Sequence, residues 1–160
     1  MVGITNALNV VADSLDAAGL PPIDEASASG ELAATFAEIR EFYARADVPL
    51  PWRLIAHDPA YARDVWLANR QAFDDRRLSR RLKEALAFAV SVTTRSRFGA
   101  PFHLGEMRRL GVGMRGVMEV LGVTQMFSSY TKIADTLQLE PDMADIAPPD
   151  MTPAPGGVRS

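Results

Sequence analysis

Residues 82–103, LKEALAFAVSVTTRSRFGAPFH, decide how this chain folds. The stretch begins as a helix whose side chains are apolar in nearly every direction, which predicts a helix buried on most sides. The threonine pair at 93–94, which favours helix weakly, is followed by a short basic turn that contains glycine. Pro101 suits the first turn of a second helix, where its missing N–H costs nothing. We therefore predict a hairpin of antiparallel helices over residues 80–92 and about 100–110.

One acid, Glu84, interrupts the apolar run, and one imidazole, His103, follows the turn. Burying a carboxylate is costly unless it is paired or protonated. A hairpin that turns at the threonine pair places the two side chains at similar heights on facing helices. A Glu–His pair in an apolar cleft can transfer protons, so both are candidate catalytic residues. The alternative is a purely structural role, with Glu84 favoured by the helix dipole and His103 hydrogen-bonded in the core.

Arg95 and Arg97 belong to the turn itself. If they extend over the Glu–His pair, they can hold a substrate carboxylate by forked hydrogen bonds. Otherwise they are exposed turn residues. The other basic residues, in segment 76–83, stand beside Asp74 and Asp75 without interleaved aromatics. We interpret that cluster as a solvated surface rather than a nucleic-acid-binding patch.

Helical periodicity continues on both sides of the hairpin, and no segment shows the alternation typical of a strand. We predict an all-α fold in which residues 1–140 form a single domain. The Pro-rich, acidic residues 141–160 are predicted to be a disordered tail or one that lies along a partner. The further helices are expected over 4–18, 31–45, 52–56, 58–73, 114–121 and 124–137.

Composition excludes several classes of function. The chain has no cysteine, so it supplies neither disulfides nor thiol catalysis. A net charge of −3 provides no field that attracts nucleic acid. No apolar run is long enough to span a membrane, and the N-terminus lacks the basic segment of a signal peptide. We expect a cytoplasmic protein without nucleic-acid or membrane partners.

The chain carries no convincing metal or cofactor motif. Its two histidines, His57 and His103, belong to different segments, and no cysteine supplements them. Residues 111–116 fit the pattern GxGxxG, but a helix precedes them where the dinucleotide motif needs a strand. We predict neither a bound metal nor a cofactor.

Residues 78–112, LSRRLKEALAFAVSVTTRSRFGAPFHLGEMRRLGV, resemble the core of the carboxymuconolactone decarboxylase family, which includes the alkylhydroperoxidase D-like (AhpD-like) proteins. The likeness covers roughly residues 49–139 and leaves 1–45 as a helical extension. Thiol-dependent members have a Glu, a Cys-x-x-Cys pair and a His. The Glu and His fall on Glu84 and His103, whereas the cysteines fall on Ser96 and Gly99. The resemblance implies an AhpD-like helical bundle that assembles into trimers or hexamers, with a pocket near the subunit contacts.

Two functions are compatible with these residues. Without thiolates, peroxide reduction through a disulfide cycle is excluded. The first interpretation is a cofactor-independent lyase, decarboxylase or isomerase acting on a small anionic carbonyl compound. In it, His103 is the general acid/base, Glu84 orients it, and Arg95, Ser96 and Arg97 bind a carboxylate-bearing substrate. The second is a non-catalytic, homo-oligomeric binding or scaffold protein in which Glu84 and His103 form a structural pair.

Overall fold

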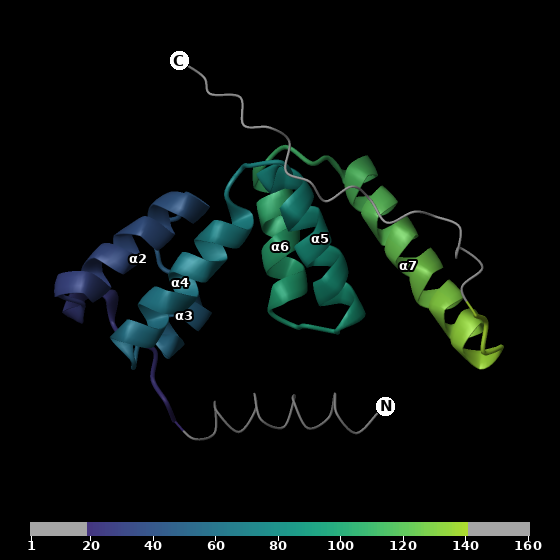
Figure 1. Ribbon diagram of the computed structural model, residues 1–160. Coiled ribbons are helices and arrows are strands. Elements are labelled where there is room, and N and C mark those ends of the chain that lie inside the picture. Colours follow the sequence, from purple (N-terminus) through teal and green to yellow (C-terminus); the bar gives the residue numbers. More distant parts are fainter. Residues whose placement is uncertain (1–18, 141–160) are drawn as a thin grey trace, which may run out of the picture.

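The computed structural model describes residues 19–140, and their regular structure is entirely helical (Figure 1). No strand occurs between residues 19 and 140, so the predicted all-α class is confirmed. The helix expected over 4–18 and the tail 141–160 lie outside the described residues. The elements are η1 (Glu25–Ser27), α2 (Gly30–Tyr43), α3 (Leu50–Ile55), α4 (Pro59–Phe73), α5 (Arg80–Thr93), α6 (Gly99–Arg109) and α7 (Met114–Thr136).

Local sequence chemistry sets where the two central helices of the chain begin. Asp58 precedes α4, and its side chain accepts a hydrogen bond from the Tyr61 N–H, while Pro59 occupies the first helical position. Ser79 precedes α5 in the same way, and its hydroxyl accepts from the Leu82 N–H. These caps satisfy N–H groups that have no partner within the helix.

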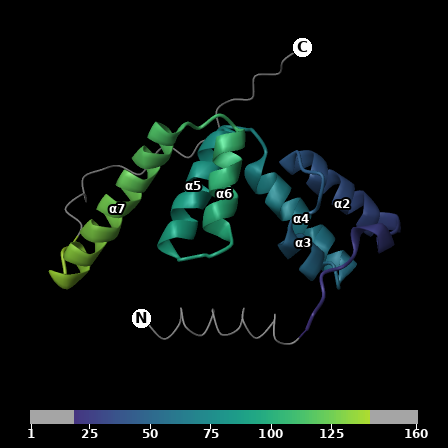
Figure 2. The same cartoon turned by 180° about the vertical axis from the view of Figure 1, so that it is seen from behind.

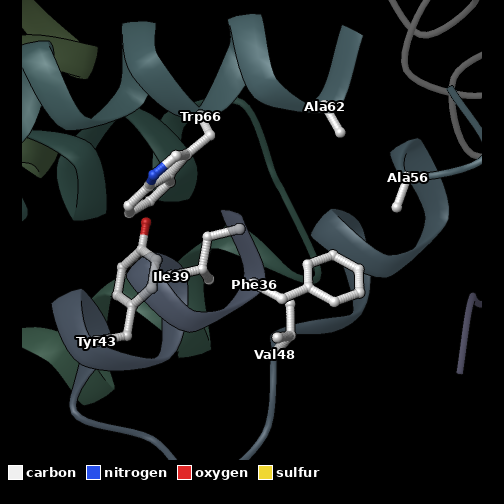
Figure 3. Close-up of a cluster of buried hydrophobic side chains, with 7 residues drawn as sticks. All are labelled: Phe36, Ile39, Tyr43, Val48, Ala56, Ala62 and Trp66. Carbon is white, nitrogen blue, oxygen red and sulfur yellow. The ribbon is translucent and has the colours of Figure 1, made fainter. Parts of the chain in front are cut away.

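Helices α2, α3 and α4 enclose the first of two hydrophobic clusters (Figure 3). Trp66 is fully buried at its centre, with Trp52 and Phe42 packed edge-on against its ring. The indole Nε1–H donates a hydrogen bond of 2.9 Å to Glu38, and this bond, with Arg63 and Arg70 nearby, lowers the pKa of Glu38. The labelled members are Phe36, Ile39, Tyr43, Val48, Ala56, Ala62 and Trp66.

Helices α5 and α6 form the predicted antiparallel hairpin in the middle of the molecule. The α2–α4 group lies on one side of it and α7 on the other, as both views show (Figures 1 and 2). Phe88, Met107 and Val117 form the second hydrophobic cluster, which joins the hairpin to α7. The hairpin reverses through residues 94–98, where Ser96 donates its N–H to the Ser91 carbonyl.

The two helices predicted after the hairpin are in fact one, α7, so the break expected near Gly122 is wrong. Thr124, which resembled the start of a new helix, donates its hydroxyl hydrogen to the Val120 carbonyl within α7. That bond satisfies the hydroxyl without a cap, and an isolated glycine inside a helix costs only about 1 kcal/mol relative to alanine. No helix within residues 19–140 is both long enough and apolar enough to cross a membrane.

The prediction that α5 is buried on most sides is not met within residues 19–140 of one protomer. Leu82, Leu86 and Val90 are 45%, 51% and 61% exposed. They recur every four residues, so they form one stripe along the helix. Among the described residues, an apolar face of α5 therefore remains at the surface.

Candidate acid–base site

The expected pairing of Glu84 with His103 is present. Glu84 lies in the second turn of α5 and is 0% exposed, while His103 lies in the middle of α6. The distance between Oε2 of Glu84 and Nδ1 of His103 is 2.7 Å. The antiparallel hairpin brings them together because both side chains face the contact between its two helices.

The other carboxylate oxygen of Glu84 also accepts a hydrogen bond. Arg80, one helical turn earlier, donates a hydrogen bond of 2.7 Å from Nε to Oε1 of Glu84. The Arg80 guanidinium lies 3.8 Å from the centroid of the Phe42 ring, a cation–π contact from the first hydrophobic cluster. Both oxygens of the buried carboxylate thus have partners, which fixes its direction toward the imidazole.

The ion pairs continue beyond Arg80. Its Nη2 lies 3.5 Å from Oε2 of Glu106, and the same oxygen accepts a hydrogen bond of 2.7 Å from Nη2 of Arg109. Hydrogen bonding to Glu106 raises the pKa of Arg109. The positive charges of Arg80 and Arg109 balance the negative charges of Glu84 and Glu106 in this network. The negative charge of Glu84 is therefore compensated without a positive charge on His103.

The surroundings of His103 leave one ring nitrogen for chemistry. The Phe73 ring lies parallel to the imidazole at 6.0 Å between centroids, and Phe102 meets it edge-on at 5.3 Å. A carboxylate can only accept, so Nδ1 donates to Glu84 and Nε2 of the neutral ring is an acceptor. No described residue hydrogen-bonds to Nε2. Every buried side-chain nitrogen and oxygen in residues 19–140 has a partner, so Nε2 reaches the surface.

The Glu84–His103 pair lies outside the larger surface cavities described for residues 19–140. Five such cavities have volumes of about 250 to 610 Å³, and neither Glu84 nor His103 lines any of these five. The side chain of His103 is 19% exposed, so the imidazole is partly accessible in the protomer.

The three turn residues predicted to bind substrate lie at the end of the hairpin. The Ser96 hydroxyl accepts a hydrogen bond of 2.8 Å from the N–H of Gly99, the first residue of α6. Arg95 and Arg97 are exposed, and Arg95 adopts a left-handed backbone conformation with φ of 58°. Within residues 19–140, no hydrogen bond or ion pair joins these three side chains to Glu84 or His103. Their role in binding substrate stays a prediction.

Sequence reasoning missed three charged members of the network. Arg80 had been assigned to the solvated basic cluster, yet it is only 8% exposed. Glu106 and Arg109 follow His103 on α6 and had no assigned role. The signal was the helical spacing of Arg80, Glu84 and Phe88, which places the arginine on the same face as the buried acid.

The described residues offer no metal site. Among residues 19–140, no group of three or more His, Asp or Glu side chains is arranged to hold an ion. The side chains that are present, an imidazole hydrogen-bonded to a carboxylate, can transfer protons and stabilise charge.

Comparisons with known proteins identify the family. The crystal structure of the alkylhydroperoxidase AhpD core from Rhodospirillum rubrum ATCC 11170 shares this fold, with a TM-score of 0.74 and 23% sequence identity. The match covers 81% of this chain and 97% of that one. No curated protein is significantly similar in sequence. The family model for carboxymuconolactone decarboxylases matches residues 59–139, which include the whole hairpin and α7. This chain, in which a buried Glu84 pairs with a partly exposed His103 and which has no cysteine, therefore belongs to the carboxymuconolactone decarboxylase family.

Proposed function

We propose that this protein is a cofactor-independent acid–base enzyme, a decarboxylase-type lyase or an isomerase, acting on a small anionic carbonyl compound. One observation carries the proposal: His103 binds a fully buried, charge-balanced carboxylate through Nδ1 and presents Nε2 at the surface. In this assignment His103 is the general acid/base, and Glu84 fixes its tautomer and orientation. The name of the family supports a substrate that carries a carboxylate on a lactone ring.

Decarboxylation by this pair would proceed as follows. The bond between the carboxylate carbon and its neighbour breaks, and CO2 leaves. The electron pair of that bond moves into the adjacent carbonyl system, which becomes an enolate. A protonated His103 stabilises the enolate oxygen by a hydrogen bond from Nε2. One proton is then delivered to carbon, so each CO2 released consumes one proton. In an isomerisation, the same nitrogen removes a proton from one carbon and returns it to another.

We also propose that the protein self-associates, as the family resemblance implies. The support is the apolar stripe on α5 together with a row of exposed apolar side chains on α7. Between the two helices lies a cavity of about 610 Å³ whose lining includes Val90, Val123 and Phe127. Exposed apolar surface of this extent is typical of an interface. The large apolar residues of α7 with half or more of their surface exposed are Met114, Met118, Val123, Phe127, Tyr130 and Ile133, and Leu137, which follows the helix, is exposed to a similar extent.

A non-catalytic scaffold of the same fold is the second candidate. The observation in its favour is that no cavity described above includes the Glu–His pair. In that case the pair and the ion network only stabilise the hairpin.

The experiment measures CO2 release from a panel of carboxylated lactones, beginning with carboxymuconolactone, and of β-keto and β,γ-unsaturated acids. His103→Gln should reduce the rate by about 100-fold or more. His57→Gln is the matched control, because His57 lies in a loop and its side chain hydrogen-bonds only to the Pro21 carbonyl among the described residues. Activity retained by His103→Gln would refute the assigned roles. A wild-type protein inactive on the whole panel, together with a large fall in Tm for His103→Gln, would favour the scaffold.

A further inference from the structure

A cavity of about 360 Å³ lies between the loop that follows α2 and the first turn of α6. Its volume is within the range of sites for small molecules. Its wall combines charged and aromatic side chains, namely Arg45, Asp47, Arg97, Phe98 and Phe102, with the aliphatic Leu50. Glu84 and His103 do not line it, so it is separate from the pair that carries the proposed function.

The charges of this cavity suit an anion. Arg97 makes no hydrogen bond or ion pair with any residue in 19–140. Among residues 19–140, Arg45 has one ionic contact, to Asp47 at 3.7 Å, and both of those side chains are exposed. The lining of the cavity therefore includes two guanidinium groups and one carboxylate, a local excess of positive charge on a chain whose net charge is −3. The planar guanidinium matches the geometry of a carboxylate and binds it through two parallel hydrogen bonds.

The aromatic wall suits a flat ligand. Phe98 stacks on Phe102 with 5.4 Å between ring centroids and 21° between ring planes. Phe102 is fixed from behind by Tyr43, which meets it edge-on at 5.2 Å. Phe98 is nearly half exposed. An exposed, well-supported ring of this kind offers a surface on which a second conjugated ring can stack.

The opposite wall is fixed before any ligand arrives. Glu25 accepts a hydrogen bond of 2.7 Å from the Val48 N–H through one oxygen, and one of 2.6 Å from Arg40 through the other. Val48 is itself buried in the first hydrophobic cluster. These contacts hold the loop that carries Arg45 and Asp47, and a wall already in place loses little conformational entropy on binding.

We propose that this cavity binds a small planar carboxylate with an aromatic or conjugated ring. The guanidinium groups of Arg45 and Arg97 hold the carboxylate, and the ring lies against Phe98. Binding here does not depend on whether the Glu84–His103 pair is catalytic.

Titration calorimetry with benzoate as the probe tests the site. Benzoate should bind saturably and more tightly than benzamide, which has the same shape without the charge, or cyclohexanecarboxylate, which has the charge without a flat ring. Arg97→Gln should weaken benzoate binding roughly 10-fold. Arg95→Gln removes a neighbouring turn arginine that does not line the cavity and should leave the Kd unchanged. Phe98→Ala should reduce the preference for benzoate over cyclohexanecarboxylate.

Three outcomes would overturn this site: no saturable binding of benzoate, equal binding of benzamide, or equal effects of Arg95→Gln and Arg97→Gln. All variants are at exposed positions, and circular dichroism checks that they fold. His103→Gln should bind benzoate as the wild type does. A protein that binds benzoate but releases no CO2 from any substrate would refute the proposed function alone, and the reverse result would refute this site alone.

Discussion

The two faces of α5 differ in a way opposite to the usual one: the buried face carries charged side chains, and the exposed face carries aliphatic ones. The inner face, which packs against α6 and α4, consists of Arg80, Glu84, Phe88 and Ser91, all buried. The outer face is the stripe of Leu82, Leu86 and Val90, each 45% exposed or more. Charged side chains are inside and aliphatic ones outside, so composition alone assigns neither face correctly.

Each face is explained by its partners. On the inner face, hydrogen bonds and opposite charges satisfy every buried polar atom in the described residues. A buried ion pair of this kind adds little net stability compared with apolar residues of similar size, but removing one partner is costly. The outer face has no partner within the described chain, and its apolar surface is available to another subunit. The inner face therefore holds the site geometry, and the outer face drives the proposed association.

Glu84→Ala should have the largest effect on stability, because it removes a buried partner of the ion pairs on the inner face. It leaves Arg80 buried without its closest carboxylate, and we expect the free energy of unfolding to fall by about 3–5 kcal/mol. Urea denaturation followed by circular dichroism measures the loss. Leu86→Ala on the outer face is the control, with an expected change within about 0.5 kcal/mol in dilute protein. Equal losses for the two variants would show that the faces do not differ in the way described.

Leu86→Lys should weaken the proposed association through the outer face. If that face is an interface, the variant buries an unpaired charge, which weakens association by several kcal/mol. Light scattering coupled to size-exclusion chromatography should then report a lower mass than for the wild type. Gln71→Lys, which adds the same charge at an exposed position of α4, outside both α5 and α7, controls for added charge. A wild-type protein that is already monomeric would contradict the proposed association.

Gly99→Ala tests how closely the inner face meets α6. An added Cβ would lie 2.6 Å from Oγ of Ser91 and 2.9 Å from Oγ of Ser96, and Ser91 belongs to that face. We expect a loss of about 1–3 kcal/mol, measured as a lower urea midpoint. Gly105→Ala in the same helix meets nothing within 4 Å and should stabilise by up to about 1 kcal/mol. If Gly99→Ala were also stabilising, the contact between the helices would be looser than described.

The smallest effect concerns Tyr43, which faces Arg80 from α2. Burial raises its pKa from 10.0 to about 12, and Glu84 and Glu106 add to the rise while Asn69 and Arg80 oppose it. The folded state therefore disfavours the ionised ring. Its contribution to stability is complete below pH 10 and is lost as the pH rises toward about 12. An ultraviolet titration should show a tyrosine that ionises late, near pH 12, and Tyr43→Phe should remove this late step. A late step of the same size in Tyr43→Phe and in the wild type would contradict this burial.

Local signals in the sequence predicted much of this architecture. The caps at Asp58 and Ser79, the apolar periodicity and the position of Pro101 were sufficient to predict the hairpin. The hairpin in turn predicted the contact between Glu84 and His103, because a helical pair that reverses midway between two residues brings them to the same height. The catalytic role of that contact and the single-domain organisation of residues 1–140 remain predictions.

The sequence by itself determined the helical class, the hairpin and the Glu–His contact, because each depends on residues close in the chain and on fixed helical spacing. Only the tertiary structure decided that Arg80 is buried, that Glu106 and Arg109 complete its network, and that Arg97 lines a cavity together with Arg45 and not with His103. It also decided which face of α5 is covered. Burial depends on which surfaces distant elements cover, and a side chain's own polarity does not specify that when charges can be paired.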